Sequence, residues 1–260
     1  MGRMGRKVKN ARWLAAVITA ATCATVAVSA QDLGVLAPAN LTKARSKAPI
    51  DITGTWFVDL GFPGSWRFGP PYPKLTPEAQ KHFDAARKAQ AEGKVYRDDI
   101  GQCWPAGVPL IMTRVWSISM VQLPTVVYMI SGFMNSLRVI NLDGRPHTDP
   151  DLIVRTFNGD SIGRFEGDTL IVDVTNFNDD TWLGSDGYFH TDKMHVVERL
   201  TRKGDILTYA VTVDDPLVLA KPWALTPRDL KLSTNKADAL LEAPPCVEHD
   251  APHIVTLDHH

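Results

Sequence analysis

Residues 194–213 read MHVVERLTRKGDILTYAVTV, and this stretch indicates the fold class most directly. Apolar and polar side chains alternate along two runs, 194–202 and 205–213, and both runs contain β-branched residues. Such alternation is typical of half-buried β-strands, and Gly204 between the two runs favours a tight hairpin turn. The stretch therefore predicts two antiparallel strands that each turn one face toward a core.

The same pattern extends upstream to Val115. It predicts further strands near residues 115–122, 125–131, 136–142, 161–166 and 168–175. Short strands joined by tight turns form an antiparallel meander, which closes into a barrel or folds into a sandwich. No glycine-rich loop follows one of these strands and opens a helix, so the sequence disfavours a dinucleotide-binding fold. The pattern thus predicts a mainly β protein.

The segment ahead of these strands predicts one more strand and one helix. Residues 52–60, ITGTWFVDL, are the first strand candidate, and the proline-rich residues 61–75 predict irregular chain. Thr76-Pro77-Glu78 predicts the start of a surface helix, because Thr caps, Pro suits the first helical position and Glu favours the positive helix end. We expect a single domain over 51–260, with an irregular tail over 244–260.

Residues 1–30 have the features of a secretory signal peptide. Basic residues without any acidic one precede an apolar run over 13–28, which ends in the small residues Val28-Ser29-Ala30. A membrane anchor is an alternative, but the run is shorter than the roughly 20 residues of a spanning helix. A lipoprotein anchored through Cys23 is another, but Cys23 lacks the usual branched apolar residue before it. We therefore expect export to the periplasm or the medium, with a flexible leader over 31–50.

The charge that remains after this cleavage disfavours two kinds of partner. Five of the 28 basic residues lie in the signal, so the rest of the chain carries 23 against 29 acidic residues, a formal net charge of −6. An acidic surface disfavours nucleic acid or an anionic membrane as the main partner. No second long apolar segment follows the signal, so the mature chain is expected to have no membrane partner.

The two remaining cysteines, Cys103 and Cys246, predict a disulfide. In an exported chain two cysteines pair more often than they stay free. A bridge between them would close a loop of about 140 residues, which the chain-entropy model values at roughly 4–5 kcal/mol. A reactive thiol and a metal ligand are the alternatives, and neither has the support of a Cys-x-x-Cys motif.

Gly54-Thr55-Trp56 resembles the Gly-x-Trp opening of lipocalin-like barrels. In those barrels the tryptophan plugs the closed end and the strands surround an apolar cavity. The motif lies on the first predicted strand of a strand-rich chain. The resemblance therefore implies an antiparallel, lipocalin-like barrel with one surface helix and an irregular tail.

A broader resemblance covers residues 100–250. Its motifs are GRFEGDTL at 163–170, FND at 177–179, TWL at 181–183, His190, HVVER at 195–199, Cys103-x-Pro-x-Gly-x-Pro, DGRPH at 143–147, Asp215-Pro216 and Lys221-Pro222-Trp223. Together they resemble a family of exported proteins of Gram-negative bacteria. The resemblance implies an exported β fold, and it implies no particular reaction.

The densest group of titratable residues lies at 176–198, where a long loop leads into a strand. On that strand Glu198 shares the apolar face with Val196 and Leu200, and a carboxylate in such a stripe suits general acid or base chemistry. We predict Glu198 and His190 as the acid/base groups, with His195 or His147 assisting. The alternative is a structural ion pair of Glu198 with a buried arginine, Arg138 or Arg164, and an outward-facing His195.

His147 lies in a second polar loop, 143–151. Asp149 or Asp151 is a candidate to orient its imidazole, while the Asp-Gly pair and the prolines favour a plain turn. A metal site is a further alternative, through His190 and His195 with His147 as a remote ligand. The wider set of His190, Asp192, His195 and Glu198 cannot converge on one ion, because His195 and Glu198, three apart on a strand, point to opposite faces. The chain has no Gly-x-Ser-x-Gly elbow, which disfavours a conventional serine hydrolase.

The predicted function combines these groups with the aromatic residues of the loops. Loop aromatics at a barrel mouth suit a flat ligand. The residues expected to position that ligand are Trp182, Tyr188, Arg164, Asp180 and Trp223. We predict an exported enzyme, a lyase, isomerase or hydrolase, that acts on a small apolar or aromatic molecule without a cofactor. The alternative is a periplasmic binding or carrier protein with the same cavity and no turnover, and a structural envelope protein is a third.

Overall fold

The computed structural model describes residues 36–42, 48–59, 70–94, 103–183, 187–235, 238 and 242. The predicted signal peptide over 1–30, the predicted disulfide partner Cys246 and the whole predicted tail over 244–260 lie outside these residues. Within the predicted leader, a short helix, α1 (Pro38–Leu41), is described. No helix in the described ranges is long and apolar enough to cross a membrane.

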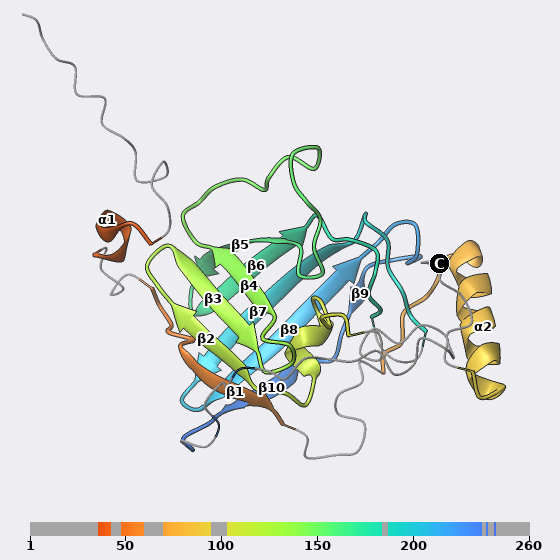
Figure 1. Ribbon diagram of the computed structural model, residues 1–260, viewed down its shortest axis with the longest axis horizontal. Coiled ribbons are helices and arrows are strands. Elements are labelled where there is room, and N and C mark those ends of the chain that lie inside the picture. The colour runs from red at the N-terminus through yellow and green to blue at the C-terminus, as the bar shows by residue number, and fades with distance from the viewer. Residues whose placement is uncertain are drawn as a thin grey trace, which may run out of the picture.

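Nine strands close into a barrel (Figure 1). They are β1 (Gly54–Val58), β2 (Ile118–Gln122), β3 (Val126–Ser131), β4 (Leu137–Asn141), β5 (Asp160–Glu166), β6 (Thr169–Thr175), β7 (His195–Lys203), β8 (Ile206–Asp214) and β10 (Arg228–Leu232). Each strand from β1 to β8 pairs with the next, and β10 closes the circle because it pairs with both β8 and β1. The predicted mainly β, lipocalin-like barrel is confirmed.

One strand pair departs from the predicted antiparallel meander. β4 and β5 run parallel, with Ile140 opposite Ser161. Two parallel neighbours need a connection that returns along the barrel, and residues 142–159 supply it as the long loop that projects from the barrel in Figure 1. This loop carries His147, so the crossover decides where that side chain lies.

The two ends of the barrel differ in the length of their connections. The hairpins β2–β3, β5–β6 and β7–β8 turn tightly at one end, here called the hairpin end. The connections from β1 to β2, from β6 to β7 and from β8 to β10 leave and re-enter the barrel at the other end, here called the loop end. Because long loops on a rigid scaffold carry most binding sites, the loop end is the place to look for one.

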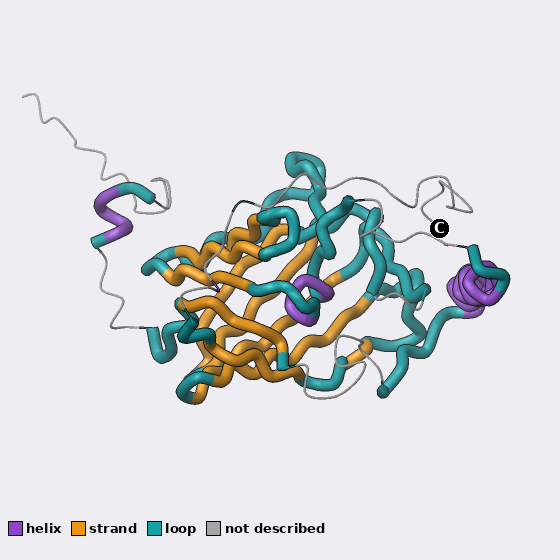
Figure 2. The backbone as a smooth tube through the Cα atoms, turned by 60° about the horizontal axis from the view of Figure 1, so that its bottom comes forward, coloured by secondary structure: helices purple, strands orange, loops and turns teal. Residues whose placement is uncertain are grey.

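The predicted helix α2 (Pro77–Ala91) lies beyond the loop end (Figures 1 and 2). As expected, Thr76 caps it: the Thr76 hydroxyl accepts the backbone amide of Ala79 at 3.3 Å. Its buried residues are only alanines, so most of the helix surface faces solvent. Phe83 on this helix stacks on Tyr188 of the loop between β6 and β7, at 4.6 Å between ring centroids.

Trp56 closes the hairpin end, as the Gly-x-Trp resemblance implied. Its side chain is fully buried, its Nε1 donates to the carbonyl of Ile52 at 2.9 Å, and the Arg202 guanidinium lies 5.1 Å from its ring centroid. Gly54, two residues earlier, has a φ of +151°, which residues with a side chain rarely adopt, and a Cβ there would also lie 2.4 Å from the Leu232 side chain. The position of Trp56 in the sequence motif and its burial in the structure therefore indicate the same closed end of the barrel.

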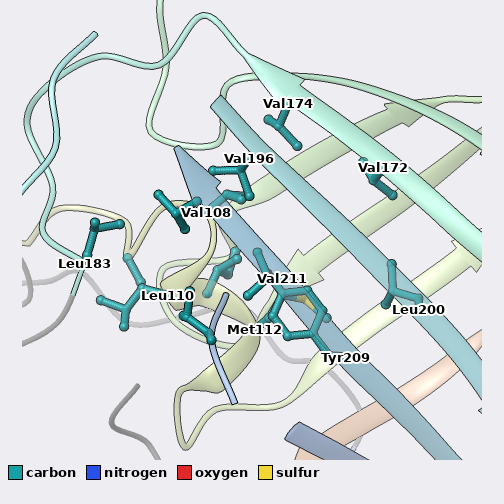
Figure 3. Close-up of a cluster of buried hydrophobic side chains, with 14 of the residues drawn as sticks. Val108, Leu110, Met112, Val172, Val174, Leu183, Val196, Leu200, Tyr209 and Val211 are labelled. Atoms are coloured by element: carbon teal, nitrogen blue, oxygen red, sulfur yellow. The ribbon is translucent and has the colours of Figure 1, made fainter. Parts of the chain in front are cut away.

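The loop end is filled by a short 3₁₀ helix, η2 (Leu110–Thr113), from the connection 59–117. Its apolar side chains are buried, and they join one cluster with residues of the barrel strands. Figure 3 shows Leu110 and Met112 beside Val196 and Val211 in this cluster. Apolar side chains of the barrel strands and of η2 therefore pack the barrel interior at the loop end.

Candidate functional site

Glu198 lies inside the barrel with both carboxylate oxygens engaged. Arg138 on β4 donates Nη1–H to Oε1 at 3.0 Å and Nη2–H to Oε2. The Tyr209 hydroxyl on β8 donates to Oε1 at 2.8 Å, and Arg138 Nε and Nη2 both donate to the Ser161 hydroxyl at 3.1 Å. Glu198 is 0% and Arg138 2% exposed. One buried network thus joins β4, β5, β7 and β8.

This network matches the structural alternative for Glu198. A bidentate guanidinium compensates the carboxylate charge in the interior, which is the condition for burying an ion at all. Burial, and after it the negative charge of Glu198, raise the pKa of Tyr209 well above its ordinary value, so its hydroxyl remains a donor. The partner is Arg138, whereas the other candidate, Arg164, pairs with Glu166 on the exposed β5–β6 hairpin.

His190 is buried in a different place, in the loop between β6 and β7. Its Nδ1 lies 3.2 Å from the carbonyl of Thr191. Since a carbonyl only accepts, we assign the proton to Nδ1, and Nε2 accepts the Thr181 hydroxyl at 2.9 Å. Burial lowers the pKa of His190. The side chain is therefore neutral at neutral pH, with both ring nitrogens bonded to loop residues.

Asp215 anchors the loop that carries His190. Its buried carboxylate accepts the backbone amide of Thr191 at 2.6 Å and the amide of Leu217 at 3.1 Å, and it also accepts the Thr191 hydroxyl. The Asp215-Pro216 motif thus ties the loop before β7 to the turn after β8. This is a folding role for a residue that the family resemblance singled out.

The burial of His190 predicts a loss of stability as the pH falls below the ordinary histidine pKa of about 6.5. The unfolded chain, with an ordinary histidine pKa of about 6.5, binds the proton before the folded chain does. The stabilising contribution is therefore present above the unfolded pKa and is lost as the pH falls through it toward the lower folded pKa. Each unit of lowering corresponds to about 1.4 kcal/mol.

The measurement is the free energy of unfolding against pH. His190→Gln, which does not titrate, is expected to flatten the curve in this range relative to the unchanged chain. His82→Gln on α2 is the matched control and should leave the curve as it is, because His82 is partly exposed. A curve of unchanged slope in His190→Gln would contradict a buried neutral imidazole.

His147 and His195 meet around a shared carboxylate on the outer face of the barrel. Nε2 of each ring lies near Oδ1 of Asp173, at 2.9 Å for His147 and 3.0 Å for His195, and Nδ1 of His147 lies 3.4 Å from Asp160. Partial burial acts to raise the pKa of Asp173, but the hydrogen bonds and positive charge of the two histidines outweigh it, so that pKa is lowered. The carboxylate is ionised at neutral pH.

The partners of His147 correct the sequence prediction. Asp149 and Asp151 were expected to orient its ring, but Asp149 instead accepts the backbone amide of Asp151 in a local turn. The crossover 142–159 carries His147 to Asp160 and Asp173, which lie on β5 and β6. A carboxylate that orients an imidazole is suited to acid/base work. The His195 side chain, however, is 43% exposed and faces outward from β7.

The four predicted catalytic residues therefore occupy three separate places. The structure brings together only His147 and His195. Glu198 points into the barrel, and His190 is bonded within its loop. Within the described ranges, no group of three or more histidine, cysteine, aspartate or glutamate side chains is arranged to hold a metal ion.

A cavity of about 330 Å³ lies at the loop end, between residues 71–74 and 221–224. We call it the aromatic pocket. Trp223, on the short strand β9 (Trp223–Ala224), lines it, and its Nε1 donates to the carbonyl of Pro71 at 2.7 Å. The Ala220 amide donates to the carbonyl of Lys74 at 2.8 Å, and Leu75 bridges to Leu219. These backbone bonds tie the two walls together.

Tyr188 supports the aromatic pocket from the loop between β6 and β7. Its ring centroid lies 5.9 Å from Trp223 and 6.4 Å from Tyr72, which lines the pocket and is 60% exposed. Gly187 brings this loop close to α2, because a Cβ there would lie 3.1 Å from Ala86. Two residues that were predicted to position a ligand, Tyr188 and Trp223, thus lie at one site.

The other predicted ligand residues lie elsewhere. Trp182 is buried and bridges to Phe189, and Asp180 accepts the side-chain amide of Asn178 at 2.8 Å. Arg164 lies near the hairpin end, paired with Glu166. Cys103 is disulfide-bonded. Its predicted partner Cys246 lies outside the described residues, so the pairing itself stays a prediction.

The sequence interpretation missed Tyr72 and Lys74 because it treated the proline-rich segment only as irregular chain. A signal was present. The segments PPYPK at 70–74 and KPW at 221–223 share proline, lysine and an aromatic residue, although they lie far apart in the chain. Proline stiffens such segments. Their similar composition is the one feature of the sequence that could have suggested that both segments belong to one site.

Comparisons with known proteins add little to this geometry. No protein-family model matches the chain, and no curated protein matches it. Among solved structures, a chain described as "REP1-NXSQ fatty acid transporter" is similar at 11% sequence identity with a TM-score of 0.33. The similarity covers 72% of this chain and 98% of that one.

Proposed function

We propose that this chain is a small-molecule-binding barrel protein that takes a flat apolar or aromatic molecule into the aromatic pocket. The observation that carries the proposal is the pocket itself: a cavity of about 330 Å³ with Tyr72 and Trp223 in its lining. Small-molecule sites are concave and mostly apolar, and they start at about this volume. Aromatic rings offer a flat ligand a large contact area.

The pocket is also rigid before any ligand arrives. Prolines flank Tyr72 and precede Trp223, and they restrict the backbone on both walls. The bond from Trp223 Nε1 to the Pro71 carbonyl holds the indole in place. A preformed site avoids the free-energy cost of ordering its walls when the ligand binds.

The positions of the titratable groups favour binding without turnover. An acid/base enzyme needs its acid, its base and its substrate within hydrogen-bond reach. Glu198 is instead paired with Arg138, His190 is bonded to Thr181, and neither belongs to the lining of the aromatic pocket. Among the predicted functions, binding without turnover, as in a carrier, therefore has better support than acid/base catalysis.

Fluorescence titration with the uncharged dye N-phenylnaphthylamine tests this function. Tyr72→Ala should weaken binding by about 2- to 12-fold, the range that corresponds to one aromatic contact. Tyr72 is largely exposed, so its removal leaves the fold intact. Tyr128→Ala, on the outer face of β3, is the matched control and should bind as before. Equal affinities of the two variants would place the dye elsewhere and overturn the proposal.

A further inference from the structure

The aromatic pocket carries two positive charges that aromatic contact alone does not require. Lys74 and Lys221 line it, one from each wall, and no acidic residue belongs to its lining of described residues. The chain as a whole carries as many acidic as basic side chains, within one charge. Two lysines beside the exposed ring of Tyr72 and the buried Trp223 are therefore a local departure from the charge balance of the chain.

Among the described residues, these two lysines lack the ion pairs that several other exposed lysines form. Lys81 pairs with Glu78, Lys94 with Glu92 and Lys231 with Asp59. In the part of the chain that the structure describes, neither Lys74 nor Lys221 takes part in such a pair. Their charge is thus balanced by solvent ions, which a bound anion can replace.

The backbone fixes the starting points of both side chains relative to the rings. Lys74 is held through its carbonyl by the Ala220 amide at 2.8 Å, one residue before Lys221. Trp223 follows Lys221 by two residues and bonds to Pro71, which precedes Lys74 by three. Lys74 and Lys221 therefore lie on opposite walls of one small cavity whose lining includes Tyr72 and Trp223.

We propose that the aromatic pocket selects a planar aromatic anion, a carboxylate or sulfonate, with its rings against Tyr72 and Trp223 and its charge beside Lys74 and Lys221. This inference rests on the proposed function and narrows it to one class of ligand. The lysines supply charge-assisted hydrogen bonds to the anion, and the aromatic rings supply apolar contact. A neutral aromatic molecule of the same shape gains only the apolar contact.

Two dyes with one skeleton separate these contributions: anilinonaphthalene sulfonate and uncharged N-phenylnaphthylamine. At low salt we expect the sulfonate to bind about 3- to 10-fold more tightly, the effect of two solvent-exposed ion pairs. The advantage should shrink as salt is added, because salt screens exposed charges. Lys74→Met with Lys221→Met should abolish the advantage, so that this variant binds the two dyes with equal affinity.

Lys203→Met, at the hairpin end, is the matched control and should retain the preference for the sulfonate. If both dyes bind in a Tyr72-dependent way with equal affinity, and the lysine variants change neither, the anion inference is wrong and the aromatic site stands. If Tyr72→Ala leaves the binding of both dyes unchanged, the proposed function itself has failed. Far-ultraviolet circular dichroism of each variant confirms that the compared chains are folded.

Discussion

Glu198→Gln is expected to lower the free energy of unfolding by about 3–5 kcal/mol, the usual loss when one partner of a buried ion pair is removed. The carboxylate is 0% exposed and is the counter-charge of Arg138, which is 2% exposed. Glutamine leaves that guanidinium as an uncompensated charge in the barrel interior. Chemical denaturation followed by tryptophan fluorescence measures the change.

Two further variants test whether the loss comes from leaving the buried charge of Arg138 without its partner. Arg138→Met with Glu198→Leu removes both charges and fills the space with apolar side chains, so it should be more stable than Glu198→Gln alone. Glu166→Gln breaks the exposed pair with Arg164 and should cost less than about 1 kcal/mol. If Glu198→Gln unfolds at the same denaturant concentration as the unchanged chain, the buried pair does not stabilise the fold.

The expected loss also changes how activity data on Glu198 are interpreted. A variant with several kcal/mol less stability leaves a larger fraction of unfolded chain, because natural domains have only about 5–15 kcal/mol in all. Lower activity of Glu198→Gln would then reflect folding as much as chemistry. Activity should therefore be divided by the folded fraction before any catalytic role is assigned.

Trp56→Ala is expected to cost about 3–5 kcal/mol, the usual loss for removing a buried aromatic side chain. Trp56 is fully buried at the hairpin end, between the backbone of Ile52 and the guanidinium of Arg202. Its removal leaves a cavity and also ends the cation–π contact with Arg202. Thermal or chemical unfolding measures the loss.

Graded variants separate the contributions of Trp56. Trp56→Phe keeps most of the apolar contact and loses the hydrogen bond to the Ile52 carbonyl, so it should fall between the alanine variant and the unchanged chain. Trp116→Ala removes a partly exposed tryptophan that packs on Phe133, and it serves as control with a smaller expected loss. A loss below about 1 kcal/mol in Trp56→Ala would mean that the indole does not hold this end together.

The sequence did not identify the hydrogen-bond partners of the predicted acid/base residues, because residues close in the sequence are often not the ones in contact. For His147 the nearby Asp149 and Asp151 were the natural candidates, yet the ring bonds to Asp173, 26 residues away. The crossover between the parallel strands β4 and β5 moves His147 along the barrel, and strand order cannot be read from the alternation of side chains. For Glu198 the alternation predicted the correct face but left open which arginine shares it.

The sequence by itself determined the features that depend on short-range patterns. Alternation predicted the strands, Gly204 predicted a hairpin, and Thr76-Pro77-Glu78 predicted the start of α2. Gly54 and Trp56 indicated the closed end of a barrel. The signals for these features are steric preferences and hydrogen bonds among residues a few positions apart, so the amino-acid sequence alone carries them.

Only the tertiary structure decided which distant residues face one another. Glu198 meets Arg138 across 60 positions, and Trp223 meets the Pro71 carbonyl across 152. Barrel closure between β10 and β8, and the parallel register of β4 and β5, set these encounters. The chemistry of the site depends on them, because an ion pair or a pocket wall exists only when separate segments are held within a few ångströms.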